Sequence, residues 1–288
     1  MIFETQNKRK LMPDIYGFDA FSPTQIAEKV ETIGVTKARL PFLPMIMLGI
    51  LAGAFIGLGA LFFTLVTSDT GLGFATSRVL GGVVFSLGLI LVVIAGAELF
   101  TGNNLLVMAW ADGRISTGEV LQNWLIVLLS NLVGAVLLAV MVSWSGHTGM
   151  NQGGIELQYL KIAAMKCSLP FGKAFFSGIM CNILVCLAVW MAMAGRSVID
   201  KVIAIVFPIA TFVAAGFEHS IANMYFITMG LLVKVWHPEF ATAHAITLEG
   251  FFLNMGPVIL GNMVGGGVFV ALVYYVIYGK LNKPASPA

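Results

Sequence analysis

Long apolar stretches dominate the chain and set its class. Six of them hold about 20 or more mostly apolar residues, which is long enough to cross a bilayer as a helix. They lack the alternation over about ten residues that is typical of membrane barrel strands. They cover residues 41–66, 79–109, 118–144, 171–194, 202–235 and 247–278. The sequence therefore predicts an all-α membrane protein with six transmembrane helices.

The segments outside these spans are mostly short. Residues 1–40 form a polar N-terminal segment without the early apolar core of a signal peptide. Ser22 and Pro23 predict that a short amphipathic helix starts there and covers residues 22–35. We expect residues 145–170 to be a long external loop. Residues 41–279 are predicted to form one channel domain, with repeats at about 41–144 and 171–279, followed by a tail over residues 280–288.

Lysine and arginine are distributed unevenly across these spans. Eleven of the 16 fall on the side of the N-terminal segment and five on the other side. Short loops rich in Lys and Arg stay in the cytoplasm. We therefore expect both termini to be cytoplasmic.

The first three spans and the last three carry matching residues at the same spacings. Glu98 and Asn103 in the second span correspond to Glu218 and Asn223 in the fifth. The other matches are residues 49–51 with 178–180, and 131–134 with 262–265. Because three spans is an odd number, the second copy enters the membrane from the opposite side. The prediction is an inverted three-plus-three repeat whose site lies at mid-depth, where helices two and five are interrupted.

Both interruptions contain glutamate. A charge at mid-membrane costs roughly 2.5–3.5 kcal/mol on insertion scales. We interpret Glu98 and Glu218 as loop-supporting groups that accept from backbone N–H groups freed by the breaks. Direct contact with a permeating ion is the alternative. Asn103 and Asn223 are expected to support the same loops.

His219 is the third ionisable residue deep in a span. The first repeat has Leu99 at the corresponding position, so His219 is not needed to hold the break. Because histidine titrates near physiological pH, we expect a functional role for it. Thr101 supplies a hydroxyl for an anion or for the imidazole. Three apolar residues are candidates to close a pore, with ordinary packing as the alternative: Phe85, Leu89 and Phe212.

Composition narrows the function classes. Hydrophobic residues make up 58% of the chain and charged residues only 10%, against about 25% charged in soluble proteins. The surface of this chain must therefore lie in lipid. The net charge of +2 does not indicate nucleic-acid binding. Three cysteines are interpreted as core residues without a redox role, and neither a metal nor a cofactor is predicted. A glycerol-type channel would carry Asn-Pro-Ala motifs, which this sequence lacks. A membrane enzyme using the buried Glu and His groups is the alternative from another class.

The residues at the breaks resemble the formate/nitrite transporter family. Residues 216–224 are similar to its fifth-helix signature and residues 96–101 to its second-helix signature. Residues 85–90 and 185–190 resemble the formate branch, and the likeness covers roughly residues 20–280. Gly102, directly after Thr101, is more typical of nitrite channels. A nitrite or hydrosulfide channel is therefore the alternative within the family.

The resemblance implies an aquaporin-like fold with one pore per subunit of a homopentamer, in a bacterial cytoplasmic membrane. It implies passive or proton-coupled, bidirectional passage of formate or a similar small monovalent anion, without enzyme activity. It also implies that the N-terminal segment closes the cytoplasmic mouth on contact with a formate-producing enzyme. The pore residues that it implies are His219 with Thr101 and Asn182 at the centre, Leu89 and Phe212 at constrictions with Phe85 near the outer one, and Lys37 and Lys166 at the vestibules.

Overall fold

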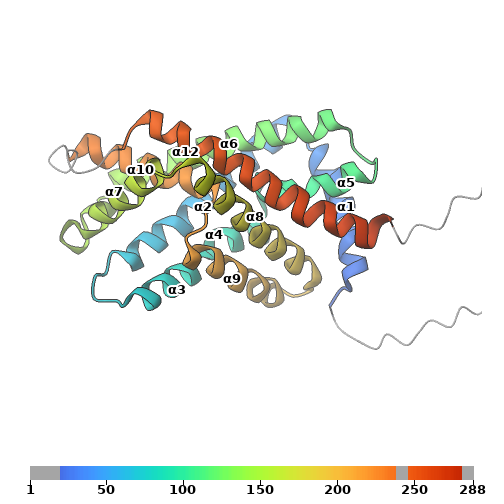
Figure 1. Cartoon of the computed structure of the whole chain (residues 1–288), viewed down its shortest axis with the longest axis horizontal. Helices are drawn as coiled ribbons and strands as arrows, with labels where there is room; N and C mark the ends of the chain where they lie inside the picture. Colours follow the sequence, from blue (N-terminus) through green and yellow to red (C-terminus); the bar gives the residue numbers. More distant parts are fainter. Residues whose placement is uncertain (1–19, 238–245, 281–288) are drawn as a thin grey trace, which may run out of the picture.

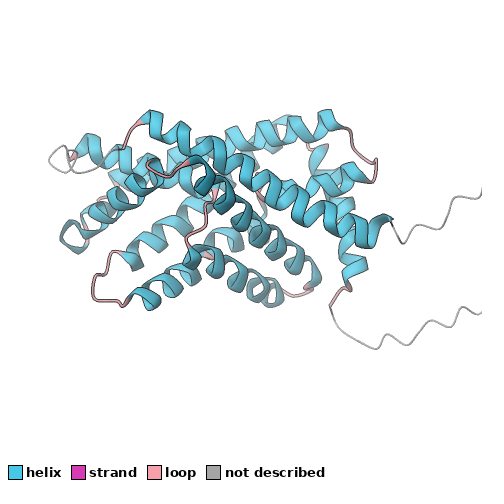
Figure 2. Cartoon of the chain, in the orientation of Figure 1, coloured by secondary structure: helices cyan, strands magenta, loops and turns pink. Residues whose placement is uncertain are grey.

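The computed structural model describes residues 20–237 and 246–280, where every regular element is a helix (Figure 2). Six helical segments in these ranges are long and apolar enough to span a membrane, as the sequence predicted. Residues 281–288 of the predicted tail and residues 1–19 of the N-terminal segment lie outside the described residues. The six segments are Phe42–Thr67 (α2), Phe74–Gly96, Thr117–Trp144 (α6), Phe171–Ala194 (α8), Val198–Ala215 (α9) and Leu248–Gly279.

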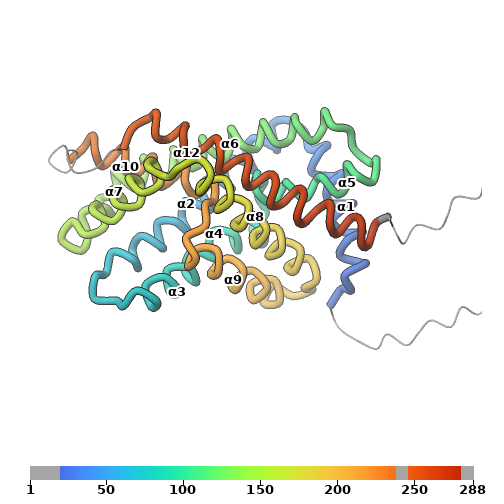
Figure 3. Tube along the Cα trace, in the orientation of Figure 1, coloured from blue at the N-terminus to red at the C-terminus, as the bar shows by residue number. Residues whose placement is uncertain are grey.

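The second and fifth predicted spans are interrupted, as expected. The second span runs through α3 (Phe74–Phe85), α4 (Leu87–Ile90) and η1 (Leu91–Gly96), and resumes at η2 (Gly102–Leu105) and α5 (Leu106–Ala111). In the fifth, α9 ends at Ala215 and α10 (Ser220–Trp236) follows. The chain between α9 and α10, orange in Figure 3, crosses the middle of the bundle. The last span is continuous and consists of α12 (Leu248–Met263), η5 (Val264–Leu272) and η6 (Tyr275–Lys280).

Helix α1 (Pro23–Ala38) is the predicted amphipathic helix, and Ser22 caps it with its side chain. Arg114, in the turn before α6, forms an ion pair of 2.9 Å with Glu31 on the buried side of α1. Gly279 of the last helix lies beside the same glutamate. Helix α1 and the end of the last span therefore lie at one end of the bundle, opposite α7 (Figure 1).

The long external loop predicted for residues 145–170 is wrong. This segment contains helix α7 (Gly154–Cys167), which packs against α10. Ile155, Tyr159 and Ala163 recur every four residues and are fully buried, so they form one apolar face. Charged residues between them hide that face from a search for continuous apolar runs. Two short turns precede the helix, η3 (His147–Gly149) and η4 (Asn151–Gly153).

Glycines bring α2 and α6 into backbone contact. A Cβ atom at Gly53 would lie 2.0 Å from the carbonyl oxygen of Asn131, and one at Gly134 would lie 1.9 Å from that of Ile50. In the second half of the chain, Gly261 of α12 approaches α8 in the same way. Small residues permit such close approach of helices in lipid. These contacts fix the helices that surround the breaks.

Gly134→Ala is expected to lower the free energy of unfolding by about 1–3 kcal/mol, because its methyl group would overlap the Ile50 carbonyl. Thermal unfolding in detergent, followed by tryptophan fluorescence, measures the effect. Gly256→Ala on α12 is the matched control, since its Cβ would meet no atom within 4 Å. Equal midpoints for the two variants would contradict the close contact.

Candidate functional site

Two breaks in the helices face each other inside the bundle. The first break covers residues 97–101, between η1 and η2, and the second covers residues 216–219, between α9 and α10. Gly96 and Gly216 adopt φ values of 87° and 80°, a left-handed conformation that favours glycine. The chain turns at these glycines and places Thr101 opposite His219.

His219 lies at the centre of the site and is 2% exposed. Its Nε2 atom is 3.1 Å from Thr101 Oγ1, and its Nδ1 atom accepts a hydrogen bond of 3.2 Å from the backbone N–H of Ala222. Because Nδ1 is an acceptor, the neutral ring carries its proton on Nε2 and donates it to Thr101. The hydroxyl proton of Thr101 is then available to a third group.

Lys37 and three other side chains form a network at the first break. Lys37 Nζ donates to Glu98 Oε1 at 2.7 Å and to Asn103 Oδ1 at 3.1 Å. Asn103 Nδ2 donates to Glu98 Oε2 at 2.7 Å and to Asn123 Oδ1 at 2.9 Å. Asn123 completes the ring by donating to the Lys37 carbonyl at 3.1 Å. Both carboxylate oxygens of Glu98 are thereby bound.

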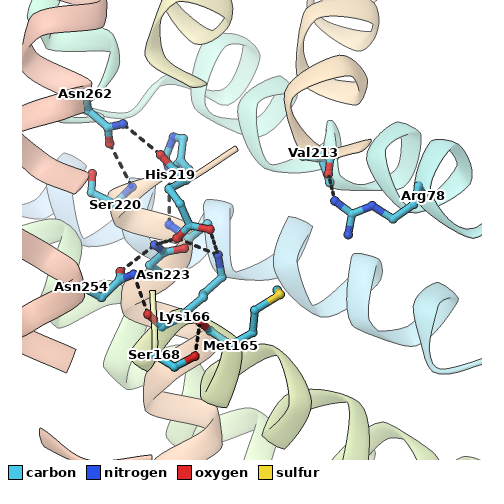
Figure 4. Close-up of polar contacts among 12 residues, drawn as sticks. Arg78, Met165, Lys166, Ser168, Val213, His219, Ser220, Asn223, Asn254 and Asn262 are labelled. Carbon is cyan, nitrogen blue, oxygen red and sulfur yellow. Dashed lines mark hydrogen bonds and ion pairs between the residues drawn. The ribbon is translucent and has the colours of Figure 1, made fainter. Parts of the chain in front are cut away.

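The second break has a network of the same four residue types (Figure 4). Lys166 Nζ donates to both carboxylate oxygens of Glu218, at 3.0 and 3.1 Å. Asn223 Nδ2 donates to Glu218 and to Asn254, and Asn254 donates to the Lys166 carbonyl. Both glutamates therefore bind lysine and asparagine side chains. The expectation that they accept from freed backbone N–H groups is wrong in this respect.

Two further asparagines bind the backbone groups that the breaks release. Asn131 Nδ2 donates to the carbonyls of Gly49 and Glu98, at 2.8 and 2.9 Å, and its Oδ1 accepts from Phe100 N–H at 3.0 Å. Asn262 makes the equivalent three bonds in the second half, with Gly178, Glu218 and Ser220. In each loop, the asparagine amide groups thus replace the backbone hydrogen bonds that a continuous helix would form.

Asn182, expected from the resemblance to partner the histidine, makes no hydrogen bond with His219. Its Nδ2 donates to the carbonyls of Thr101 and Asn262, at 3.2 and 2.7 Å, and to Asn104 Oδ1 at 3.1 Å. Asn182 therefore holds the first break against the last span. Its Oδ1 is buried and has no partner within the described ranges.

Two cavities approach the centre from opposite ends. The cavity beside α1, here called the α1 cavity, has a volume of about 390 Å³, and the cavity beside α7, the α7 cavity, has about 500 Å³. The α7 cavity reaches His219, and the α1 cavity reaches Leu99 of the first break and Gly102 directly after it. The cationic residues that line them are Lys29, Lys37 and Lys201 in the α1 cavity, and Arg78, Lys161 and Lys166 in the α7 cavity.

Apolar side chains separate the two cavities. The ring of Phe212 stacks on His219, with centroids 5.8 Å apart and planes inclined by 19°. The ring of Phe85 contacts the Phe212 ring edge-on, with centroids 5.8 Å apart, and both phenylalanines line the α7 cavity. Leu89 lies one turn beyond Phe85, lines the α1 cavity and is 2% exposed. Of the three residues proposed for the constrictions, Phe85 and Phe212 therefore line the α7 cavity together with His219, and Leu89 lines the α1 cavity.

The sequence missed several residues of the site. Lys37 and Lys166 line the cavities, but glutamate already binds their ammonium groups. Among the described residues, neither Lys161 nor Lys201 forms an ion pair, and neither was singled out beforehand. Asn123 and Asn254 were also missed, although each stands eight residues before a matched asparagine. That shared spacing is the signal that could have identified them.

The fold and the site together define a class of protein. Two interrupted helices of an integral membrane protein face each other between two cavities that carry cationic side chains. This is the arrangement of a channel or transporter for a small anion. Within the described ranges, no group of three or more His, Cys, Asp or Glu side chains could hold a metal ion.

Comparison with known proteins identifies the family. Residues 24–276 match the formate/nitrite transporter family. The formate channel FocA of Escherichia coli K12 is 43% identical over 276 residues, which cover 92% of this chain and 97% of that protein. A solved structure described as a pentameric formate channel with formate bound is 41% identical, with a TM-score of 0.78 over 82% of this chain and 97% of that one. A second, described as an FNT family ion channel, is 32% identical, with a TM-score of 0.79 over 88% of this chain and 99% of that one. The chain belongs to the formate/nitrite transporter family.

Glu218→Ala is expected to lower the free energy of unfolding by about 3–5 kcal/mol, because the buried ammonium of Lys166 would lose its anion. Chemical unfolding in detergent measures this loss. The double variant Lys166→Met with Glu218→Gln should recover most of it, because no unpaired charge then remains buried.

Glu119→Gln is the control for this experiment. It breaks the solvent-accessible pair between Glu119 and Arg39 and should change stability little. A double variant as unstable as Glu218→Ala alone would contradict the account of the buried pair.

Proposed function

We propose that this chain is a channel subunit that passes formate across a membrane. The observation that carries the proposal is the Thr101–His219 hydrogen bond, placed between two cavities that both contain cationic side chains. The similarity to FocA and to a structure with bound formate supports formate as the anion. The family is one of transporters, so we take the chain to be a transport protein and not an enzyme.

Assembly and location form part of the proposal. A pentamer with one pore per subunit is supported by the similar structure described as pentameric. A bacterial cytoplasmic membrane is supported by the FocA relative from Escherichia coli. The excess of Lys and Arg on the α1 side supports a cytoplasmic position for both termini. A formate-producing enzyme as partner of the N-terminal segment would bind residues before α1 that lie outside the described ranges.

Lysines that form no ion pair with any described residue attract the anion to the α1 cavity. Lys29 donates one hydrogen bond to the carbonyl of Met193, and Lys201 lines the same cavity. Burial lowers the pKa of the Lys29 ammonium, and the neighbouring charges of Lys201 and Arg196 lower it further. Asp200 is close by, but its carboxylate accepts from the backbone N–H groups of residues 196 and 197. A cluster of like charges of this kind stabilises a bound anion.

The centre of the pore offers hydrogen-bond donors to an anion that loses its water there. A simple carboxylic acid has a pKa of about 3.5–4, so formate is an anion at neutral pH. The apolar side chains of Leu89, Phe85 and Phe212 oppose the entry of a bare charge. The free hydroxyl proton of Thr101 can donate to the carboxylate while His219 Nε2–H holds the hydroxyl oxygen.

Two routes follow from this geometry. In the first, His219 as imidazolium stabilises the anion, and charge flows as in a simple channel. In the second, His219 passes a proton to formate, and neutral formic acid crosses the apolar constrictions. Lower pH favours the second route.

His219→Phe is expected to remove the pH dependence of formate movement while leaving a folded oligomer. Formate uptake into liposomes, at external pH of about 7.5 and about 5.5, measures this dependence while the internal pH is recorded. Thr101→Val should lower the flux about tenfold, because the carboxylate loses a hydrogen-bond donor.

Thr101→Ser keeps the hydroxyl and is the control. An unchanged pH profile in His219→Phe would remove the histidine from the mechanism. Free movement of nitrite without any formate flux in the unaltered protein would overturn the proposed substrate.

Lys201→Gln is expected to raise the KM for formate supplied from the α1 side by roughly two- to fivefold, most strongly at low salt. Lys161→Gln should raise the KM only for formate supplied from the α7 side, and it serves as the mirror control. Flux across planar bilayers with formate added to one side separates the two. A change of equal size from both sides would contradict the assignment of these lysines to separate cavities.

A further inference from the structure

Gly266 of η5 lies against three side chains near the first break. A Cβ atom at this position would lie 2.5 Å from Asn182 Nδ2, 2.7 Å from Cys186 Sγ and 2.9 Å from Asn104 Cβ. These distances are shorter than the contacts between atoms in a close-packed protein interior. Any residue larger than glycine would therefore displace these side chains.

The three side chains bind carbonyl groups at the end of the first break. Asn182 Nδ2 donates to the Thr101 carbonyl at 3.2 Å, and Cys186 Sγ donates to the same carbonyl at 3.4 Å. Asn104 Nδ2 donates to the Phe100 carbonyl at 3.0 Å, and its Oδ1 accepts from Asn182 at 3.1 Å. Two successive carbonyls are thus held by side chains that all lie against one glycine.

The amide of Asn182 also connects the first break to the second. Its Nδ2 atom donates to the carbonyl of Asn262, which precedes Gly266 by four residues, at 2.7 Å. The side chain of Asn262 binds the residues on either side of His219 (Figure 4). Asn182 therefore joins the loop that carries Thr101 to the residue that holds the loop of His219.

The first half of the chain has the opposite distribution of small and large residues. By the spacing of the repeat, Gly266 corresponds to Ala135, and Asn182 corresponds to Gly53. A Cβ atom at Gly53 would overlap the Asn131 carbonyl oxygen, so the first half has no room for a side chain there. Glycine against alanine in the first half thus becomes asparagine against glycine in the second. This exchange makes room for one amide, beside the first break.

We infer that Gly266 is a positioning residue for transport, whose missing side chain leaves the space from which Asn182 holds Thr101. The hydroxyl of Thr101 is thereby kept 3.1 Å from His219 Nε2. A methyl group at Gly266 would push the amide away from the Thr101 carbonyl, and the hydroxyl would lose its alignment with the imidazole. This inference rests on the proposed passage of formate past Thr101 and His219.

The test is whether Gly266 acts through Thr101. Gly266→Ala is expected to lower formate flux into liposomes about fivefold, because a hydrogen bond that holds Thr101 is lost. Adding Gly266→Ala to Thr101→Val should leave the flux at the level of Thr101→Val alone, about tenfold below the unaltered protein, because both changes affect the same hydroxyl. Independent effects would multiply to about fiftyfold.

Gly230→Ala is the control for a close helix contact elsewhere. Its Cβ atom would overlap that of Ala163, where α10 packs against α7 and away from the first break. Both glycine variants should lower the thermal midpoint in detergent. Flux per assembled oligomer, with assembly checked by size-exclusion chromatography, should fall only in Gly266→Ala.

A second variant separates transport from packing. Asn182→Gly combined with Gly266→Ala copies the arrangement of Gly53 and Ala135 in the first half. This variant should recover part of the thermal midpoint that Gly266→Ala loses, because the overlap with the amide is gone. Its formate flux should stay low, since no amide then holds Thr101.

A fiftyfold loss in Gly266→Ala with Thr101→Val would overturn the inference alone. Full flux in Gly266→Ala, or in its combination with Asn182→Gly, would do the same. Failure of both of these variants to assemble would overturn it too, because the glycine would then serve folding and not transport. Absence of formate flux in the unaltered protein would overturn the proposed function and, with it, this inference.

Discussion

Backbone groups released by a helix break inside a membrane must find new hydrogen-bond partners, since lipid offers none. Both breaks in this chain meet that requirement with asparagine side chains. Asn131 and Asn262 each bind two carbonyls and one N–H group, and together they tie both loops to the helices around them. Once the backbone is satisfied in this way, the breaks can hold a polar centre at mid-depth.

Corresponding residues of the two repeats hold the scaffold, and differing residues form the centre. The Lys–Glu–Asn–Asn networks have the same residue types at both breaks and share most of their bonds. They differ at the lysine, which binds the first asparagine at the first break but both glutamate oxygens at the second. The polar residues of the centre have apolar counterparts: His219 corresponds to Leu99, Thr101 to Ile221, and Asn182 to Gly53. A symmetric framework therefore carries an asymmetric site, in which a single imidazole meets a single hydroxyl.

The charged residues near the pore fall into two groups: those that hold the loops and those that line the cavities. The two glutamates neutralise the lysines nearest the breaks, so these four groups hold the loops without adding net charge. The positive charge that faces an entering anion comes from Lys29, Lys201 and Lys161, which stand further from the centre. In the proposed mechanism, this arrangement draws an anion inward and then passes it to hydrogen-bond donors at the apolar side chains.

Local sequence alone determined the membrane class and the six spans, through the length of the apolar runs, and the start of helix α1, through its capping residues, because each depends only on neighbouring residues. Spacing within the chain also located both breaks and His219, since the repeat is visible in the sequence. The sequence did not determine helix α7, whose charged residues interrupt its apolar face, or the partners of Asn182 and of both glutamates. It also missed the bonds of Arg78 to α9, which lie 135 and 136 residues away along the chain. Only tertiary packing decides such contacts, because they depend on which helices lie side by side and not on local pattern.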